Sequence, residues 1–145
     1  MIKILCVGKI KEKYLNELID DYQKRLQKYH QVTIVELKDN PIYEKEITSL
    51  KEKVNFKDYN IALDLKGKKI TSEDFAKKMD KIFLENSNIT FIIGGSNGLD
   101  DELRSMASEV ISFSDLTFPH GLFRGILLEQ IYRTFKINNN ETYHK

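Results

Sequence analysis

The chain has 145 residues, a length that fits one domain with a single hydrophobic core. Hydrophobic residues make up 41% and charged residues 31% of the sequence, which excludes a disordered chain, and no apolar run approaches the ~18 residues of a membrane span. The formal net charge of +1 speaks against a protein that holds nucleic acid by bulk electrostatics, because such domains are usually strongly basic.

The N-terminal segment MIKILCVGK has a short apolar run and no small-residue cleavage site. These features are not typical of a secretory signal, so we expect a cytoplasmic protein without a membrane segment. Cys6 is the only cysteine, which excludes an internal disulfide and a thiolate metal cluster. Because it lies between Leu5 and Val7 in a strand-like run, Cys6 is expected to pack in the core.

Periods of 2 and of 3.6 residues alternate along the chain and predict strands alternating with helices. The predicted elements are a strand at 2–7, a helix from Tyr14 to Leu26, a strand at 32–37, a helix at 43–54, a strand at 60–65, a helix capped by Thr71 or Ser72, a strand at 89–93, a helix beginning near Asp100-Asp101 that buries Leu103, Met106 and Val110, a strand at 109–113 and a helix from Leu122 to Ile137. This order predicts an α/β fold: one domain over residues 1–145, with a mainly parallel sheet in a three-layer sandwich.

Glycine and lysine gather at the predicted carboxyl ends of the strands. These ends are Gly8-Lys9, Lys66-Gly67-Lys68-Lys69, Gly94-Gly95 and the loop Ser114 to Gly121. Ligands of open parallel sheets sit beyond the carboxyl ends of the strands. The pattern therefore favours a phosphate-bearing or nucleoside ligand at this edge, or a protein that associates with the ribosome without catalysis.

The segment FIIGGSNGL, residues 91–99, ends a strand at adjacent glycines. It matches only half of the dinucleotide fingerprint, because Gly94 is adjacent to Gly95 where the pattern requires a spacer. Asp115 does lie about twenty residues beyond, where the ribose-binding acid of a nicotinamide enzyme would stand. A plain tight turn, a nicotinamide oxidoreductase and another ligand site all stay open at this point.

The predicted helix from Leu122 to Ile137 is apolar around well over half of its circumference. Such a helix must be covered on more than one side, which favours a partner helix from a second copy, that is, a homodimer. Burial wholly inside its own domain is the alternative. Gly125 either permits close backbone approach or is merely tolerated, and Glu129 and Arg133, four apart, can pair along the helix.

The chain closes with the polar run 138–141 and then Tyr143-His144-Lys145. Chain ends usually fray, so a disordered tail is one interpretation. An aromatic ring, an imidazole and an ammonium group are also a compact set for holding a nucleobase and a phosphate.

Four motifs together, FIIGGSNGL, SFSDLTFPH, RGILLEQIYR and NNETYHK, resemble the RlmH family, SPOUT-class methyltransferases that modify a pseudouridine in bacterial 23S ribosomal RNA. The resemblance spans the whole chain and is strongest over 91–145. It implies a C-terminal trefoil knot and S-adenosylmethionine bound, bent, in the knot at a dimer interface, with no metal. The implied cofactor contacts are Leu63, Gly94, Phe113, Ser114, Asp115, Leu116, Thr117 and Phe118.

The resemblance also implies that the acceptor is ring nitrogen 3 of the pseudouridine, an imide nitrogen that must lose its proton. His144 is expected to act as the base or to orient it, because it is the only tail side chain that titrates near neutrality. Tyr143 would stack on or hydrogen-bond the base, and Arg124 or Arg133 would hold a phosphate. His120, after Pro119, is expected to fix the loop.

Weak net charge makes selection of one stem-loop in free RNA difficult, so the expected substrate is the assembled ribosome or its large subunit. The sequence departs from the family pattern at Gly121, Gly125 and Thr142. The two glycines predict a looser start of the last helix, and Thr142, in place of a proline, predicts a less rigid tail.

Overall fold

A computed structural model describes all 145 residues and contains the ten expected elements in the expected order. They are β1 (Ile2–Val7), α1 (Lys13–Leu26), β2 (Val32–Leu37), α2 (Tyr43–Lys53), β3 (Tyr59–Lys69), α3 (Ser72–Glu85), β4 (Ile89–Ile93), α4 (Asp101–Met106), β5 (Glu109–Ser112) and α5 (His120–Asn138). No helix combines the length and the apolar character that crossing a membrane requires.

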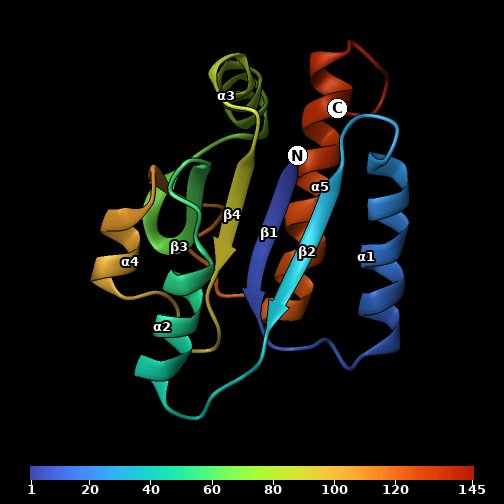
Figure 1. Cartoon of the computed structure of the whole chain (residues 1–145). Coiled ribbons are helices and arrows are strands. Elements are labelled where there is room, and N and C mark those ends of the chain that lie inside the picture. Colours follow the sequence, from blue (N-terminus) through green and yellow to red (C-terminus); the bar gives the residue numbers. More distant parts are fainter.

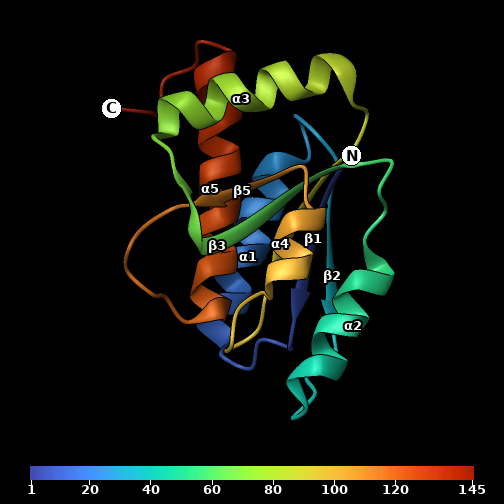
Figure 2. The same ribbon diagram turned by 90° about the vertical axis from the view of Figure 1, so that its left-hand side faces the viewer.

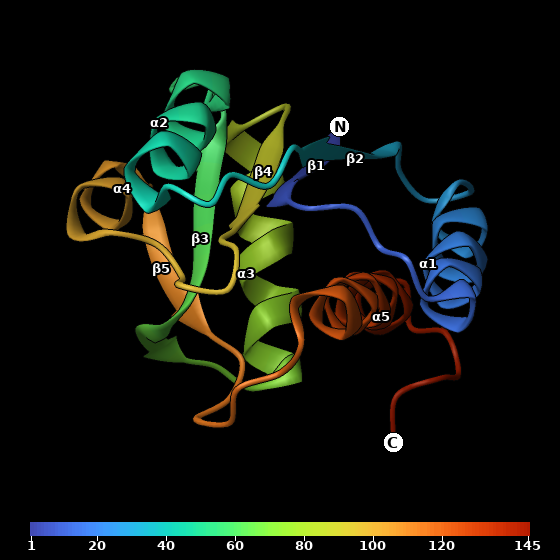
Figure 3. The same cartoon turned by 90° about the horizontal axis from the view of Figure 1, so that it is seen from below.

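The five strands form one parallel sheet in the order β2-β1-β4-β3-β5. Helices α1, α3 and α5 cover one face, and α2 and α4 cover the other (Figures 1 and 3). The predicted α/β three-layer sandwich is therefore confirmed. The strands end at the lower edge in Figure 1, while both chain termini lie at the opposite, upper edge.

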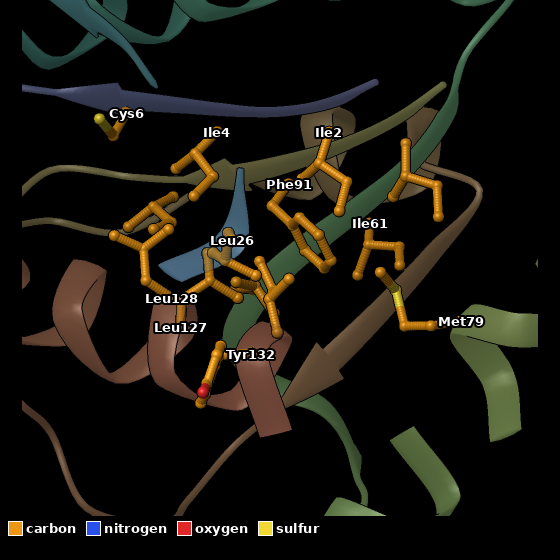
Figure 4. Packing of buried hydrophobic residues seen from close by; sticks show 14 of the residues in the cluster. Ile2, Ile4, Cys6, Leu26, Ile61, Met79, Phe91, Leu127, Leu128 and Tyr132 are labelled. Atoms are coloured by element: carbon orange, nitrogen blue, oxygen red, sulfur yellow. The ribbon is translucent and has the colours of Figure 1, made fainter. Parts of the chain in front are cut away.

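Side-chain alternation along the strands builds two cores. On the α1, α3 and α5 face, Ile4, Cys6 and Phe91 belong to a cluster of 20 buried residues that extends to Met79 and Leu128 (Figure 4). The smaller cluster on the other face has nine buried residues, supplied by β1, β3 and β4 and by α2, α4 and the glycine loop. Cys6 is buried in the larger core, as predicted.

Three details of the sequence prediction are corrected. Helix α4 ends at Met106, which is only half-buried, and Val110 lies in β5 rather than on that helix. His120 and Gly121 form the first turn of α5 instead of belonging to the preceding loop. Strand β3 continues to Lys69, beyond the predicted end at residue 65.

Helix α5 packs on the sheet with α1 on one flank and α3 on the other (Figure 3). As predicted, α5 is covered on more than one side, and the covering elements belong to its own chain. Gly125 explains the close approach of α1, because a Cβ there would lie 2.7 Å from Leu18 Cδ2. The outward side of α5 keeps Leu122 and Ile126 half-exposed.

Candidate functional site

A cavity of about 810 Å³ opens at the carboxyl edge of the sheet. The end of β3, the glycine loop after β4, the loop after β5 and the first turn of α5 form its walls. This is the edge where ligands of parallel sheets bind. All but one of the predicted cofactor residues line it: Leu63, Gly94, Phe113, Ser114, Leu116, Thr117 and Phe118.

The β3 wall of the cavity is a bulge. Strand β3 pairs with β5 up to Leu63, leaves the register, and pairs again from Lys68. Gly67 is required where the two strands meet again, since a Cβ there would lie 2.5 Å from the backbone carbonyl carbon of Ile111. The bulge places Leu65 and Lys66 at the cavity, both exposed to solvent.

The glycine loop after β4 closes on itself. Gly98 donates its backbone N–H to the Gly95 carbonyl at 3.0 Å and has a positive φ of 70°. Asp100 then caps α4 by accepting a hydrogen bond from the Leu103 backbone at 2.8 Å. The apolar strand thus ends in a backbone turn that presents main-chain groups, with few side chains, to the cavity.

Gly94 leaves no room for a side chain. A Cβ at this position would lie 2.7 Å from the backbone of Gly98, which cannot move away as a flexible side chain would. We expect Gly94→Ala to lower the free energy of unfolding by about 1–3 kcal/mol, the usual cost of overpacking. Urea denaturation measures this change.

Gly98→Asn is the matched control in the same turn. A Cβ at Gly98 would meet nothing closer than 3.6 Å, and asparagine adopts a positive φ more readily than other residues. The control should cost about 1 kcal/mol or less. Equal losses for the two variants would contradict the steric account of Gly94.

The loop after β5 is shaped by serines and aromatic rings. Ser114 Oγ accepts the Leu116 backbone N–H at 2.9 Å, and the Phe118 ring stacks on Phe123 of α5 with centroids 6.4 Å apart. Leu116 remains 69% exposed. Asp115, the one predicted cofactor residue outside the cavity lining, is exposed and pairs with Lys69 of β3.

Sequence reasoning missed several lining residues. Arg104 comes from α4, Asp64 directly follows Leu63, and Phe123 comes from α5. His120 also lines the cavity, and its Nδ1 is buried without a hydrogen-bond partner. An acidic residue at the carboxyl end of a buried strand was the one signal in the sequence that pointed to Asp64.

The C-terminal tail folds back onto α5. Tyr143 Oη donates to Glu129 Oε2 at 3.2 Å and lies 3.2 Å from Tyr22 Oη, while its ring packs edge-on against Tyr132. Burial raises the pKa of Tyr143 further above its ordinary value. The Arg133 guanidinium lies over the same ring, 4.8 Å from its centroid.

Both nitrogens of His144 have partners. Its Nδ1 lies 3.0 Å from Arg133 Nη1, and its Nε2 lies 2.6 Å from Glu73 Oε1 on α3. Because a guanidinium only donates, Nδ1 must accept, and the ring proton must then be on Nε2. The hydrogen bond from His144 lowers the pKa of Glu73.

The structure brings Tyr143, His144 and Arg133 together, but away from the cavity. Phe123 lines the cavity and Arg133 contacts the tail, and these residues are ten positions apart on α5, a rise of ~15 Å along the helix. The tail lies at the amino edge of the sheet (Figure 2). Within one chain, the predicted cofactor and catalytic residues therefore form two separate groups.

The prediction that Arg124 holds a phosphate is wrong. Its side chain is 1% exposed, and both of its terminal nitrogens are engaged inside the protein, while its Nε is buried without a hydrogen-bond partner. It donates to Glu36 Oε2 at 2.6 Å and to the carbonyls of Val7 and Gly8 at 2.8 and 2.7 Å. Of the two arginines considered for a phosphate, Arg133 is the more exposed, at 23%.

Comparison with known proteins identifies the family. A family model described as a predicted SPOUT methyltransferase matches residues 1–144. The chain is 48% identical to ribosomal RNA large subunit methyltransferase H 1 of Clostridium perfringens SM101 and 47% identical to ribosomal RNA large subunit methyltransferase H of Clostridium botulinum Kyoto, each over 99% of both chains. The chain belongs to the RlmH family of SPOUT methyltransferases.

The fold agrees with a solved member of a methylase family. The structure of a probable methylase family protein from Haemophilus influenzae Rd KW20 superimposes with a TM-score of 0.60 at 12% identity, over 99% of this chain and 70% of that one. Membership of the RlmH family makes this protein a methyltransferase, which replaces the nicotinamide and non-catalytic interpretations of the glycine loop and the lysines.

Proposed function

We propose that this RlmH-family protein uses S-adenosylmethionine to methylate ring nitrogen 3 of a pseudouridine in 23S ribosomal RNA, in the cytoplasm. The observation that supports this most directly is the cavity at the carboxyl edge. It is lined by Leu63, by Gly94 and by most of the loop 113–118, the positions that the family resemblance assigns to the cofactor.

The cavity has the chemistry that an adenosine moiety requires. Leu63, Leu116 and Phe118 supply flat apolar walls, and the glycine loop supplies backbone N–H and carbonyl groups. The buried, unpaired Nδ1 of His120 is a polar atom that a bound molecule would satisfy. When bound, S-adenosylmethionine supplies an electrophilic methyl group, so the protein must mainly hold the acceptor nitrogen in line.

The tail supplies the groups for the nucleobase. A neutral His144 with a lone pair on Nδ1 would accept the imide proton once substrate displaces Arg133. Tyr143, a protonated phenol at neutral pH, would stack on the base or donate a hydrogen bond to it. Arg133 would then be available to a phosphate.

The separation of the cavity from the tail supports a homodimer with shared sites. A second copy packed on the outward side of α5 would cover Leu122 and Ile126 and, with the two α5 helices antiparallel, would place one tail beside the other cavity. We further propose that the loop after β5 threads through the preceding chain in a knot. The ion pair of Asp115 with Lys69 is consistent with this crossing.

A large ribonucleoprotein is the substrate we propose, because the protein's own charge is weak. Lys66 and Lys68 extend from the β3 bulge beside the cavity and are exposed, whereas Lys69 is neutralised by Asp115. Two such lysines can contact backbone phosphates but carry no sequence information. Selection of one nucleotide would then rely on the shape of the assembled ribosome.

Calorimetry tests the cofactor assignment. We expect the purified protein to bind S-adenosylmethionine and S-adenosylhomocysteine, and both to raise the melting temperature, because a ligand of the native state stabilises it. NAD serves as the negative control. No heat and no melting shift with either sulfur compound would contradict the proposal.

Transfer of labelled methyl groups tests the substrate. Ribosomes or large subunits that lack the modification should be labelled at one pseudouridine, and naked 23S transcript much less. Ribosomes that already carry the modification control for other sites. Equal labelling of transcript and ribosome would contradict the ribosomal substrate without affecting the cofactor assignment.

A further inference from the structure

Asp64 is a nearly buried carboxylate between the two loops that line the cavity. It follows Leu63, the last β3 residue paired with β4, and its side chain is only 10% exposed. Its Oδ1 accepts the backbone N–H of Lys66 in the β3 bulge at 2.9 Å. Its Oδ2 accepts the backbone N–H of Leu99 in the glycine loop at 3.4 Å.

A third contact ties the same carboxylate to α4. Arg104 Nη1 lies 3.5 Å from Asp64 Oδ2 and also donates to the Leu99 carbonyl. The Arg104 side chain is 14% exposed, so solvent screens this pair less than it screens the surface pairs of the protein. Asp64 thus accepts hydrogen bonds from three segments: the bulge, the glycine loop and α4.

We propose that Asp64 is a positioning residue that, with Arg104, holds the bulge and the glycine loop in the spacing that admits the cofactor. This inference rests on the proposed function only for the identity of that cofactor. Leu99 packs in the smaller core, but residues 65–67 of the bulge and 95–98 of the glycine loop are exposed or only partly buried, so an acceptor shared between the two loops fixes their separation before any ligand binds.

Asp64→Asn separates this role from simple space filling. Asparagine has nearly the same volume but only one acceptor oxygen, and its amide group would face the N–H donors of Leu99 and Arg104. One of the two loops therefore loses the acceptor of its backbone N–H. We expect the dissociation constant for S-adenosylmethionine and S-adenosylhomocysteine to rise about tenfold or more.

Two measurements test the proposal. Calorimetry gives the cofactor affinity, and methyl transfer should show KM for the cofactor rising by a larger factor than kcat falls. Hydrogen exchange on the ligand-free protein should show faster exchange in residues 65–67 and 95–99 of Asp64→Asn, with protection retained elsewhere. Asp64→Glu keeps both oxygens and the charge, and should restore most of the affinity.

Glu109→Gln is the matched control. Glu109 lies at the start of β5, at the other end of the β3–β5 pair, and accepts from Tyr59 Oη at 2.6 Å while pairing with Lys78 at 2.9 Å. Its neutralisation should leave cofactor affinity and the exchange of both loops unchanged.

The outcomes are distinct. Wild-type affinity together with wild-type loop exchange in Asp64→Asn would overturn the proposed role of Asp64. If the wild-type protein itself bound no S-adenosylmethionine, the proposed function would fail, and the exchange measurement on the ligand-free protein would still decide whether Asp64 fixes the two loops.

Discussion

Arg124→Met is expected to lower the free energy of unfolding by about 2–4 kcal/mol, the cost of leaving two buried carbonyl groups without their donor. Glu36 adds little to this cost, because its side chain is 39% exposed and water can solvate it. Arg124 lies almost wholly inside the protein and joins α5 to the ends of β1 and β2. Its loss would leave the carbonyls of Val7 and Gly8 without their donor and Glu36 without its cation. Methionine fills most of the volume, so the measured change reports mainly the polar contacts.

Urea denaturation at one fixed protein concentration measures this effect, since the stability of the proposed dimer would depend on concentration. Arg124→Lys should fold if Arg124→Met does not, and should lose about 1–3 kcal/mol because an ammonium replaces a fork of donors. Arg25→Met, which breaks an exposed pair with Asp21, is the control and should cost less than about 1 kcal/mol. A change for Arg124→Met as small as the control would contradict the account.

Local patterns were enough to predict the elements and their layers. Alternation in β1 separates Ile4 from Leu5 and sends each to a different core, and the same rule holds along β4. The apolar circumference of α5 correctly indicated cover on more than one side, which α1 and α3 supply. These features depend on residues close together in the sequence, so hydrophobic periodicity and helix-capping residues suffice to predict them.

Contacts between distant residues could not be predicted in this way. Arg124 meets Glu36 across 88 positions, and nothing local distinguishes a buried arginine from one that binds phosphate. Asp64 meets Leu99 across 35 positions. The β3 bulge likewise depends on the fit of Gly67 against Ile111, and its lysines alone suggested only a loop.

The residues that line the cavity were predicted more completely than their arrangement in space. Leu63 and Gly94 lie at adjacent strand ends because β3 and β4 are neighbours in the sheet, an arrangement that strand order decides. The family resemblance supplied the residues but said nothing of where the tail rests in a single chain. That His144 lies against Glu73 of α3 emerges only from the structure.

His144→Ala should reduce methyl transfer by about 10²–10⁴-fold, the usual contribution of a general base, while S-adenosylmethionine binding persists. Gly94→Val should abolish cofactor binding. The added atoms have no space beside Gly98 and would displace the glycine loop that lines the cavity. Each homodimer is then inactive for a different reason. Calorimetry distinguishes the two defects, and loss of cofactor binding in His144→Ala would contradict the assignment of the tail to the nucleobase.

A mixed dimer of the two variants decides whether sites are shared. If the cavity of one copy works with the tail of the other, one site combines an intact cavity with an intact tail, and about half of wild-type activity returns. If each chain used its own tail, both sites would keep a defect and the mixture would stay inactive. Two affinity tags isolate the mixed species. In the control, Lys53→Gln replaces one of the two variants, because Lys53 ends α2 and does not line the cavity. The ~15 Å of α5 between the cavity and the tail favours the shared arrangement, because crossing it within one chain would require the tail to leave Glu73 and Arg133.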